Sequence, residues 1–192
     1  QIQSGEYLIF NDNKLKKEFY FNYLTTKIST KSFDELKSEF LNILRDTIQR
    51  LIKFANGRQI VVPLSGGYDS RLIASLLKQA NYQNVTCFTY GKKSSSEVVT
   101  SQKVANKLGF KWFFVEYNEQ SINQNFPQSN EFQKYYKFAS NHISIFLTQD
   151  YFAVKYLHEN KIINDDAIFV PGHTGDFLSG LHLDKAEIAN RD

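Results

Sequence analysis

Apolar residues at helical spacing mark the longest element that the sequence predicts. They recur at intervals of three and four, which is typical of one face of an amphipathic helix. The positions concerned are Phe33, Leu36, Phe40, Leu44, Ile48 and Leu51. Ser32 and Glu35 have the Ser-x-x-Glu form of a capping box, so the helix should begin after Ser32. We expect it to end near Asn56 and Gly57.

The residues before this helix show a different pattern. Two runs rich in aromatic residues, 6–10 and 15–21, flank the polar triplet 11–13. Such an arrangement predicts a β-hairpin. We therefore assign residues 1–30 to a hairpin and linker that continue from a preceding domain, and residues 31–192 to the main domain.

Beyond residue 58 strand-like and helix-like runs alternate, which indicates a parallel sheet with crossover helices. The predicted strands are residues 59–64, 85–90, 111–117 and 167–170. The predicted helices are residues 71–80, a helix from the Ser94-x-x-Glu97 box to Gly109, and two pieces within residues 131–160. A polar loop is expected at residues 118–130. The fold class is α/β, a doubly wound parallel sheet in three layers.

Composition narrows the range of partners. The chain has 192 residues and is 42% hydrophobic, enough for one domain with a sizeable core. Its 23 basic and 20 acidic residues are too balanced to indicate a nucleic-acid or membrane partner, and no apolar run approaches the roughly 18 residues of a membrane span. We expect a cytoplasmic protein. The sequence has no methionine, so we expect it to be a piece of a longer protein.

The lone cysteine carries little chemistry. Cys87 lies in an apolar run and has no second cysteine with which to form a disulfide. We expect it to be a small buried apolar residue and not a nucleophile.

The strand at residues 59–64 runs through a glycine-rich loop directly into a helix. The loop consists of Leu64, Ser65, Gly66, Gly67, Tyr68, Asp69 and Ser70. Two glycines leave room for backbone N–H groups to face a phosphate, and the helix dipole adds positive potential. Ser65 and Ser70 can donate hydrogen bonds to the same anion. Because Asp69 would repel that anion unless a cation lay between them, the loop predicts Mg²⁺ as well.

Other loop classes do not fit. No Gly-Lys-Ser/Thr follows as in a Walker loop, and the Gly-x-Gly-x-x-Gly dinucleotide fingerprint is lacking. Two adjacent glycines can also form an ordinary tight turn. The full pattern, Leu-Ser-Gly-Gly-x-Asp-Ser after an apolar strand, favours a nucleotide site over such a turn.

This loop resembles the signature of the N-type ATP pyrophosphatases, which include GMP synthetase, NAD synthetase, asparagine synthetase and tRNA-thiolating enzymes. The chain is most similar to the synthetase domain of asparagine synthetase. Residues 87–91 followed by Glu97, and residues 170–176 at the place of that family's Gly-Glu-Gly-x-Asp-Glu motif, extend the resemblance. It implies a fold of the adenine-nucleotide α-hydrolase-like (HUP) type. It also implies an ATP-dependent ligase that converts a carboxylate to an acyl-adenylate, with AMP and pyrophosphate as products.

The resemblance and the expected topology together give a set of site residues. Loops after the first and fourth strands should meet where the strand order reverses, which brings Asp69 and Asp176 to one Mg²⁺. Taken alone, Asp176 could equally be a turn residue. The implied catalytic residues are Asp176 and His173. The implied ATP-binding residues are Leu64, Ser65, Gly66, Gly67, Asp69, Ser70 and Gly172.

Departures from the family pattern leave the substrate open. His173 replaces a glutamate, Phe177 replaces an acid and Arg71 replaces a small residue. His173 could serve as a base, orient pyrophosphate or cap a turn. We expect a carboxylate and an amine or ammonia donor as small-molecule partners, with a possible glutaminase domain or subunit.

Two other interpretations stay open. A tRNA-thiolating enzyme would call for a basic RNA-binding face or paired cysteines. A degenerate ATP-binding or regulatory domain is the other, because Phe177 replaces an acid and the family's domain continues with more helices after the equivalent of Gly180.

Overall fold

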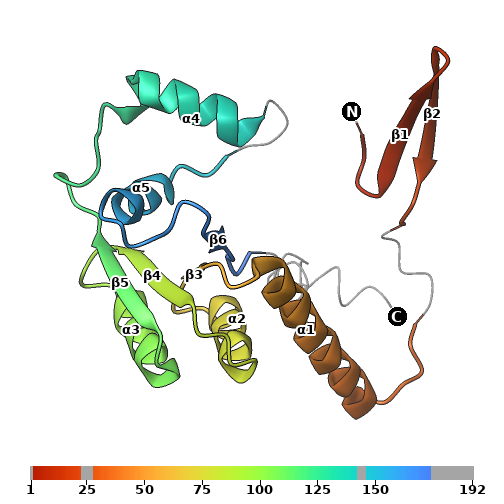
Figure 1. Ribbon diagram of the computed structural model, residues 1–192, viewed down its shortest axis with the longest axis horizontal. Coiled ribbons are helices and arrows are strands. Elements are labelled where there is room, and N and C mark those ends of the chain that lie inside the picture. The colour runs from red at the N-terminus through yellow and green to blue at the C-terminus, as the bar shows by residue number, and fades with distance from the viewer. Residues whose placement is uncertain (1, 23–27, 142–145, 174–192) are drawn as a thin grey trace, which may run out of the picture. The chain divides into compact units, whose positions relative to one another are not determined.

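The computed structural model describes residues 2–22, 28–141 and 146–173 (Figure 1). The chain divides into two compact units, Gln1–Leu41 and Asn42–Asp192. Helix α1, Phe33–Ala55, begins in the first unit and ends in the second. The expected domain boundary at residue 30 stays a prediction.

The first unit contains the predicted hairpin. Strand β1, Glu6–Asn11, pairs antiparallel with β2, Lys14–Phe19, in a register that sets Glu6 opposite Phe19. The two turn residues, Asp12 and Asn13, have φ angles of 48° and 58°. Asp and Asn tolerate this left-handed conformation better than most residues, and it suits the twist of a tight hairpin.

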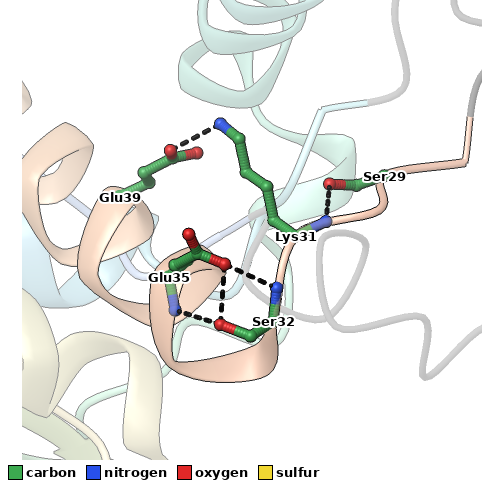
Figure 2. Close-up of polar contacts among 5 residues, drawn as sticks. All are labelled: Ser29, Lys31, Ser32, Glu35 and Glu39. Atoms are coloured by element: carbon green, nitrogen blue, oxygen red, sulfur yellow. Dashed lines mark hydrogen bonds and ion pairs between the residues drawn. The ribbon is translucent and has the colours of Figure 1, made fainter.

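The predicted capping box starts α1 (Figure 2). The Glu35 carboxylate accepts hydrogen bonds from the backbone N–H and the hydroxyl of Ser32, both at 2.8 Å. In return the Glu35 N–H lies 3.3 Å from Ser32 Oγ. These bonds from the Ser32 hydroxyl and backbone lower the pKa of Glu35. A carboxyl group with a lowered pKa stabilises the fold at neutral pH, and that contribution is lost as pH falls through the folded-state pKa.

The second unit is built on a four-stranded parallel sheet with the order β5-β4-β3-β6. Its strands are β3 Ile60–Pro63, β4 Val85–Gly91, β5 Lys111–Glu116 and β6 Ile168–Phe169. Ile60 of β3 pairs with Val85 on one side and with Ile168 on the other. The strand order therefore reverses between β3 and β6, which in open parallel sheets is where ligands bind.

Helices cover both faces of this sheet (Figure 1). Helices α2 (Tyr68–Gln79), α3 (Ser96–Leu108) and the end of α1 pack on one face, where Val62, Leu77 and Ala105 are fully buried. Helix α5, Tyr151–Glu159, covers the other face through Ala153 and Leu157. Helix α4 is Asn130–Ser140. The prediction of a three-layer, doubly wound α/β fold is confirmed. No helix in the described part of the chain has the length and apolar character needed to cross a bilayer.

Some predicted boundaries were wrong. Helix α3 is capped by Ser95 and not by Ser94, because the Ser95 hydroxyl is the one that accepts a hydrogen bond from the Glu97 N–H, at 3.3 Å. The expected end at Gly109 is confirmed by its left-handed φ of 71°. The polar loop after β5 contains a short 3₁₀ helix, Phe126–Gln128, whose Phe126 is only 3% exposed and packs against Phe132, Tyr151 and Phe152.

Cys87 is fully buried in β4, as predicted. Loss of hydration on burial disfavours the thiolate and raises the pKa of the thiol to about 12. We expect the native protein to react with an aromatic disulfide reagent at pH 8 far more slowly than the unfolded chain. The rate is measured from the absorbance of the thiolate that the reagent releases. The control is the same protein in guanidinium chloride. Fast, complete labelling of the folded protein would contradict the burial.

Candidate functional site

The loop after β3 is closed by its own hydroxyl groups. Ser65 Oγ and Ser70 Oγ lie 3.1 Å apart, and Ser70 Oγ accepts a hydrogen bond from the Ser65 N–H at 3.1 Å. The Gly67 N–H in turn donates to Ser65 Oγ. Gly67 is the N-cap of α2 and supplies no side-chain cap. The two serines thus lie together at the positive end of a helix dipole, as the sequence predicted.

The loop is packed against α3. A Cβ atom on Gly66 would lie 3.3 Å from Glu97 Cγ and 3.4 Å from Glu97 Cα. Glycine at this position therefore allows the loop to lie close to the first turn of α3. That turn also brings the Glu97 side chain to the edge of the site.

The loop after β6 meets the start of α2. The Val170 N–H donates to Val61 O at 2.9 Å, which continues the pairing of β6 with β3. A Cβ on Gly172 would lie 2.8 Å from Ser70 N and 3.2 Å from Asp69 Cβ. The two loops are therefore neighbours, as the reversal of strand order predicted.

These segments enclose a cavity of about 390 Å³, here called the nucleotide pocket. The predicted site residues that line it are Leu64, Ser65, Gly67, Asp69, Ser70, Gly172 and His173. Asp176, the predicted catalytic and metal-binding aspartate, and Phe177 lie outside the described residues. The roles assigned to all these residues stay predictions.

Several other residues line the pocket without a role predicted from the sequence. They are Pro63, Phe88, Thr89, Tyr90, Glu97, Asp150 and Pro171. Residues 88–90 end the strand beside β3, so the rule that ligands lie at the carboxyl ends of parallel strands could have found them. Asp150 comes from the start of α5 and carried no local signal.

A buried hydrogen-bond network supports the floor of the pocket. Thr89 Oγ1 lies 2.6 Å from Leu64 O and 2.7 Å from Ser101 Oγ, and it accepts a hydrogen bond from Trp112 Nε1 at 3.0 Å. Thr89 and Ser101 are buried. One hydroxyl group in β4 therefore links the residue after β3 with β5 and α3.

Tyr90 and Asp150 also line the nucleotide pocket. Burial raises the pKa of the Tyr90 phenol, and the hydrogen bond to Asp150 and the charges of Asp150 and Glu97 raise it further. Its ring stacks on that of Tyr117 at 4.8 Å between centroids. Tyr90 is consequently a neutral hydrogen-bond donor at physiological pH.

The carboxylates of the pocket suit a cation only together with a ligand. Asp69, Glu97 and Asp150 line it, yet no group of three or more His, Cys, Asp or Glu side chains in the described ranges could hold a metal ion. Mg²⁺ commonly takes one or two carboxylates and completes its coordination with phosphate oxygens and water. Asp69, beside the phosphate-type loop, fits that arrangement.

One comparison with known proteins gives the family, and another gives two more distant relatives. The family model described as asparagine synthase matches residues 40–152, more than half of the chain. An NH₃-dependent NAD⁺ synthetase of Mesoplasma florum is 35% identical over 86 residues, which are 44% of this chain and 35% of that protein. A tRNA-specific 2-thiouridylase of Campylobacter lari is 37% identical over 70 residues, which are 34% of this chain and 21% of that protein. The chain thus matches about a third or less of these relatives' lengths.

Solved structures give weaker similarities. An NH₃-dependent NAD synthetase of Campylobacter jejuni aligns over 74% of this chain and 59% of its own, with 18% identity and a TM-score of 0.44. A predicted subunit of a tRNA methyltransferase of Methanocaldococcus jannaschii aligns over 69% of this chain and 60% of its own, with 20% identity and a TM-score of 0.34.

Proposed function

The chain belongs to the asparagine synthase family, within the PP-loop ATP pyrophosphatases, and from this premise we propose that it adenylates a carboxylate with ATP so that an amine can convert it to an amide. One observation carries the proposal: the hydroxyl-lined loop at the start of α2 lies against the loop of Gly172 in one pocket, at the point where the strand order reverses. Such a pocket holds an anionic ligand against a helix N-terminus.

Each part of the nucleotide pocket has its own proposed role in the reaction. The start of α2, Ser65 and Ser70 bind the phosphates that leave as pyrophosphate. A carboxylate oxygen of the substrate attacks the α-phosphorus, and the bond to the β-phosphate oxygen breaks. Asp69 and Asp176 would hold Mg²⁺, which would neutralise charge on the departing pyrophosphate. His173, exposed at the pocket rim, is the candidate base for the incoming amine.

The substrate carboxylate is proposed to be other than free aspartate. His173 stands where the family has a glutamate, and Phe177 stands where it has an acid. These replacements change the charge of the site and remove hydrogen-bond acceptors, and specificity that rests on polar pairs does not usually survive such changes. The amine could come from ammonia, from a glutaminase domain or subunit, or from a larger molecule.

The test is the position at which ATP is cut. The protein is incubated with Mg²⁺, α-labelled or γ-labelled ATP, and pools of carboxylates with amines. We expect labelled AMP from the first nucleotide and labelled pyrophosphate from the second. ADP as product would refute the proposed cleavage. Robust conversion of labelled aspartate and ammonia to asparagine would refute the substrate assignment alone.

A tRNA-thiolating function has one observation in its favour, the 37% identity to a thiouridylase over 70 residues. The lone cysteine speaks against it, because Cys87 is fully buried and its thiol pKa is raised to about 12. A degenerate ATP-binding domain would bind ATP and release neither AMP nor pyrophosphate with any carboxylate. The cleavage assay therefore separates that alternative from the proposed ligase.

A further inference from the structure

A second cavity of about 570 Å³, here called the α5 pocket, adjoins the nucleotide pocket. Asp150 lines both cavities. The rest of its wall is largely apolar and aromatic. The apolar and aromatic lining side chains include Tyr135, Phe138, Tyr151, Val154, Ile163 and Phe169. A pocket of this kind, with few polar groups, is typical of a small-molecule site.

The basic side chains of the α5 pocket are already paired. Lys155 Nζ lies 2.6 Å from Glu131 Oε1, and His158 Nε2 lies 3.0 Å from Asp165 Oδ1. The Asp165 side chain is 96% exposed, so water screens its charge. The half-buried Asp150 is therefore the charge best placed to select a ligand, and it selects against anions.

The Asp150 side chain does not cap the helix that it precedes. It precedes α5 as the N-cap, where an aspartate commonly accepts hydrogen bonds from the first helical N–H groups. Its side chain makes no such cap bond. The carboxylate instead lies close enough to the Tyr90 phenol to raise the pKa of that group, and both side chains line the nucleotide pocket. Asp150 therefore stands at the wall common to both cavities.

Aromatic rings form part of the lining of the α5 pocket. The rings of Tyr135 and Tyr151 lie 4.7 Å apart between centroids, and Tyr151 also packs on Phe126 at 4.6 Å. Aromatic faces bind apolar groups and attract organic cations. Together with Asp150 they suit a ligand that has a cationic head and an apolar body.

We infer that the α5 pocket binds an apolar primary amine, with its ammonium group at Asp150 and its body among the rings of Tyr135 and Tyr151. This amine is the nucleophile that receives the activated acyl group in the nucleotide pocket. The role as nucleophile rests on the proposed function, whereas binding of the amine does not.

Transfer of the acyl group from the adenylate to the amine releases two protons and AMP. The ammonium loses one proton to solvent, and the nitrogen lone pair then forms a bond to the acyl carbon of the adenylate. The bond between that carbon and the phosphate oxygen breaks, and its electron pair leaves on AMP. The nitrogen loses a second proton, for which His173 is the candidate acceptor. The products are a secondary amide and AMP.

Two ligands with the same apolar body and opposite charge test the inference by calorimetry on the full chain. Phenethylamine and 3-phenylpropionate share a ring and a two-carbon chain. We expect the amine to bind at least about tenfold more tightly, and Asp150→Asn to remove most of that preference. Asp166→Asn is the matched control. Asp166 is exposed and follows the pocket-lining Asp165 in the chain, but it does not line the pocket itself, so this variant should bind both ligands as the natural chain does. If Asp150→Asn fails to fold, Asp150→Glu replaces it in the test. This variant retains the charge and should retain part of the preference for the amine.

Equal binding of the two ligands, or a preference unchanged in folded Asp150→Asn, would overturn the inference. The cleavage assay reports on the proposed function separately. AMP and pyrophosphate formation without amine binding would refute the amine site alone. Amine binding without AMP formation under any condition would support the site and refute its place in amide synthesis.

Discussion

Replacement of Gly172 by valine is expected to abolish ATP binding while most of the fold persists. A Cβ at this position would lie 2.8 Å from Ser70 N, closer than Cβ atoms approach backbone atoms, and 3.2 Å from Ser70 Cα, a tight contact. Neither neighbour is the tip of a flexible side chain, so either the loop after β6 or the start of α2 must move. Either movement displaces the N–H groups at the helix start that are proposed to face the phosphates. Calorimetric titration with Mg²⁺ and ATP should therefore show no binding heat at millimolar ATP.

Gly57→Ala is the control for general destabilisation. Gly57 follows α1 with a left-handed φ of 83°, and a Cβ there would have nothing within 4 Å. Alanine should therefore cost about 1–2 kcal/mol of stability through backbone strain and leave ATP affinity unchanged. Gly172→Val that binds ATP normally would show that the two loops do not form one site.

Thr89→Val is expected to give the largest loss of stability among conservative changes near the site. Valine has nearly the same shape but removes the hydroxyl that lies 2.6 Å from Leu64 O and 3.0 Å from Trp112 Nε1. Buried donors and acceptors left without partners cost about 1–3 kcal/mol each, so we expect a fall of about 2–4 kcal/mol in the free energy of unfolding. Urea denaturation followed by circular dichroism measures it.

Thr86→Val in the same strand provides the comparison. Thr86 Oγ1 accepts one hydrogen bond from Gln59 Nε2 at 2.8 Å, and that amide also donates to Ile162 O at 3.1 Å. Gln59 keeps a partner after the change, so the loss should be only about 0.5–1.5 kcal/mol. Equal losses for the two variants would mean that the several hydrogen bonds of the Thr89 hydroxyl contribute no more to stability than the single one of Thr86.

The sequence predicted the elements of this fold well where local chemistry defines them. The Ser32–Glu35 box and the left-handed Gly109 set helix ends through contacts within one or two turns. Ser94 was wrong as a cap because three consecutive serines offer equivalent hydroxyls, and only the folded backbone selects Ser95. The buried Phe126 in a polar loop escaped notice because its partners are on α4 and α5.

The site residues that belong to a local motif could be predicted from the sequence, whereas those brought in by tertiary packing could not. The loop at residues 65–70 and Gly172 follow from motif and topology. Asp150 could not be predicted, because its place depends on how α5 packs over β4 and on its contact with Tyr90. Thr89 likewise looked like one more strand residue until Trp112 and Leu64 were placed around its hydroxyl.

The β1–β2 hairpin bears on how this protein behaves at high concentration. It is a two-stranded sheet, so each strand has an edge without a strand partner among the described residues, and Phe10, Leu15 and Phe19 are more than half exposed. Such an edge is a template for pairing between molecules. Lys16 and Lys17 of β2 are exposed, and each is ion-paired within the hairpin, with Glu18 and Glu6 respectively. A second copy that paired with this edge would have to bury or break these ion pairs, and charged side chains on an edge strand oppose intermolecular β-sheet growth in this way.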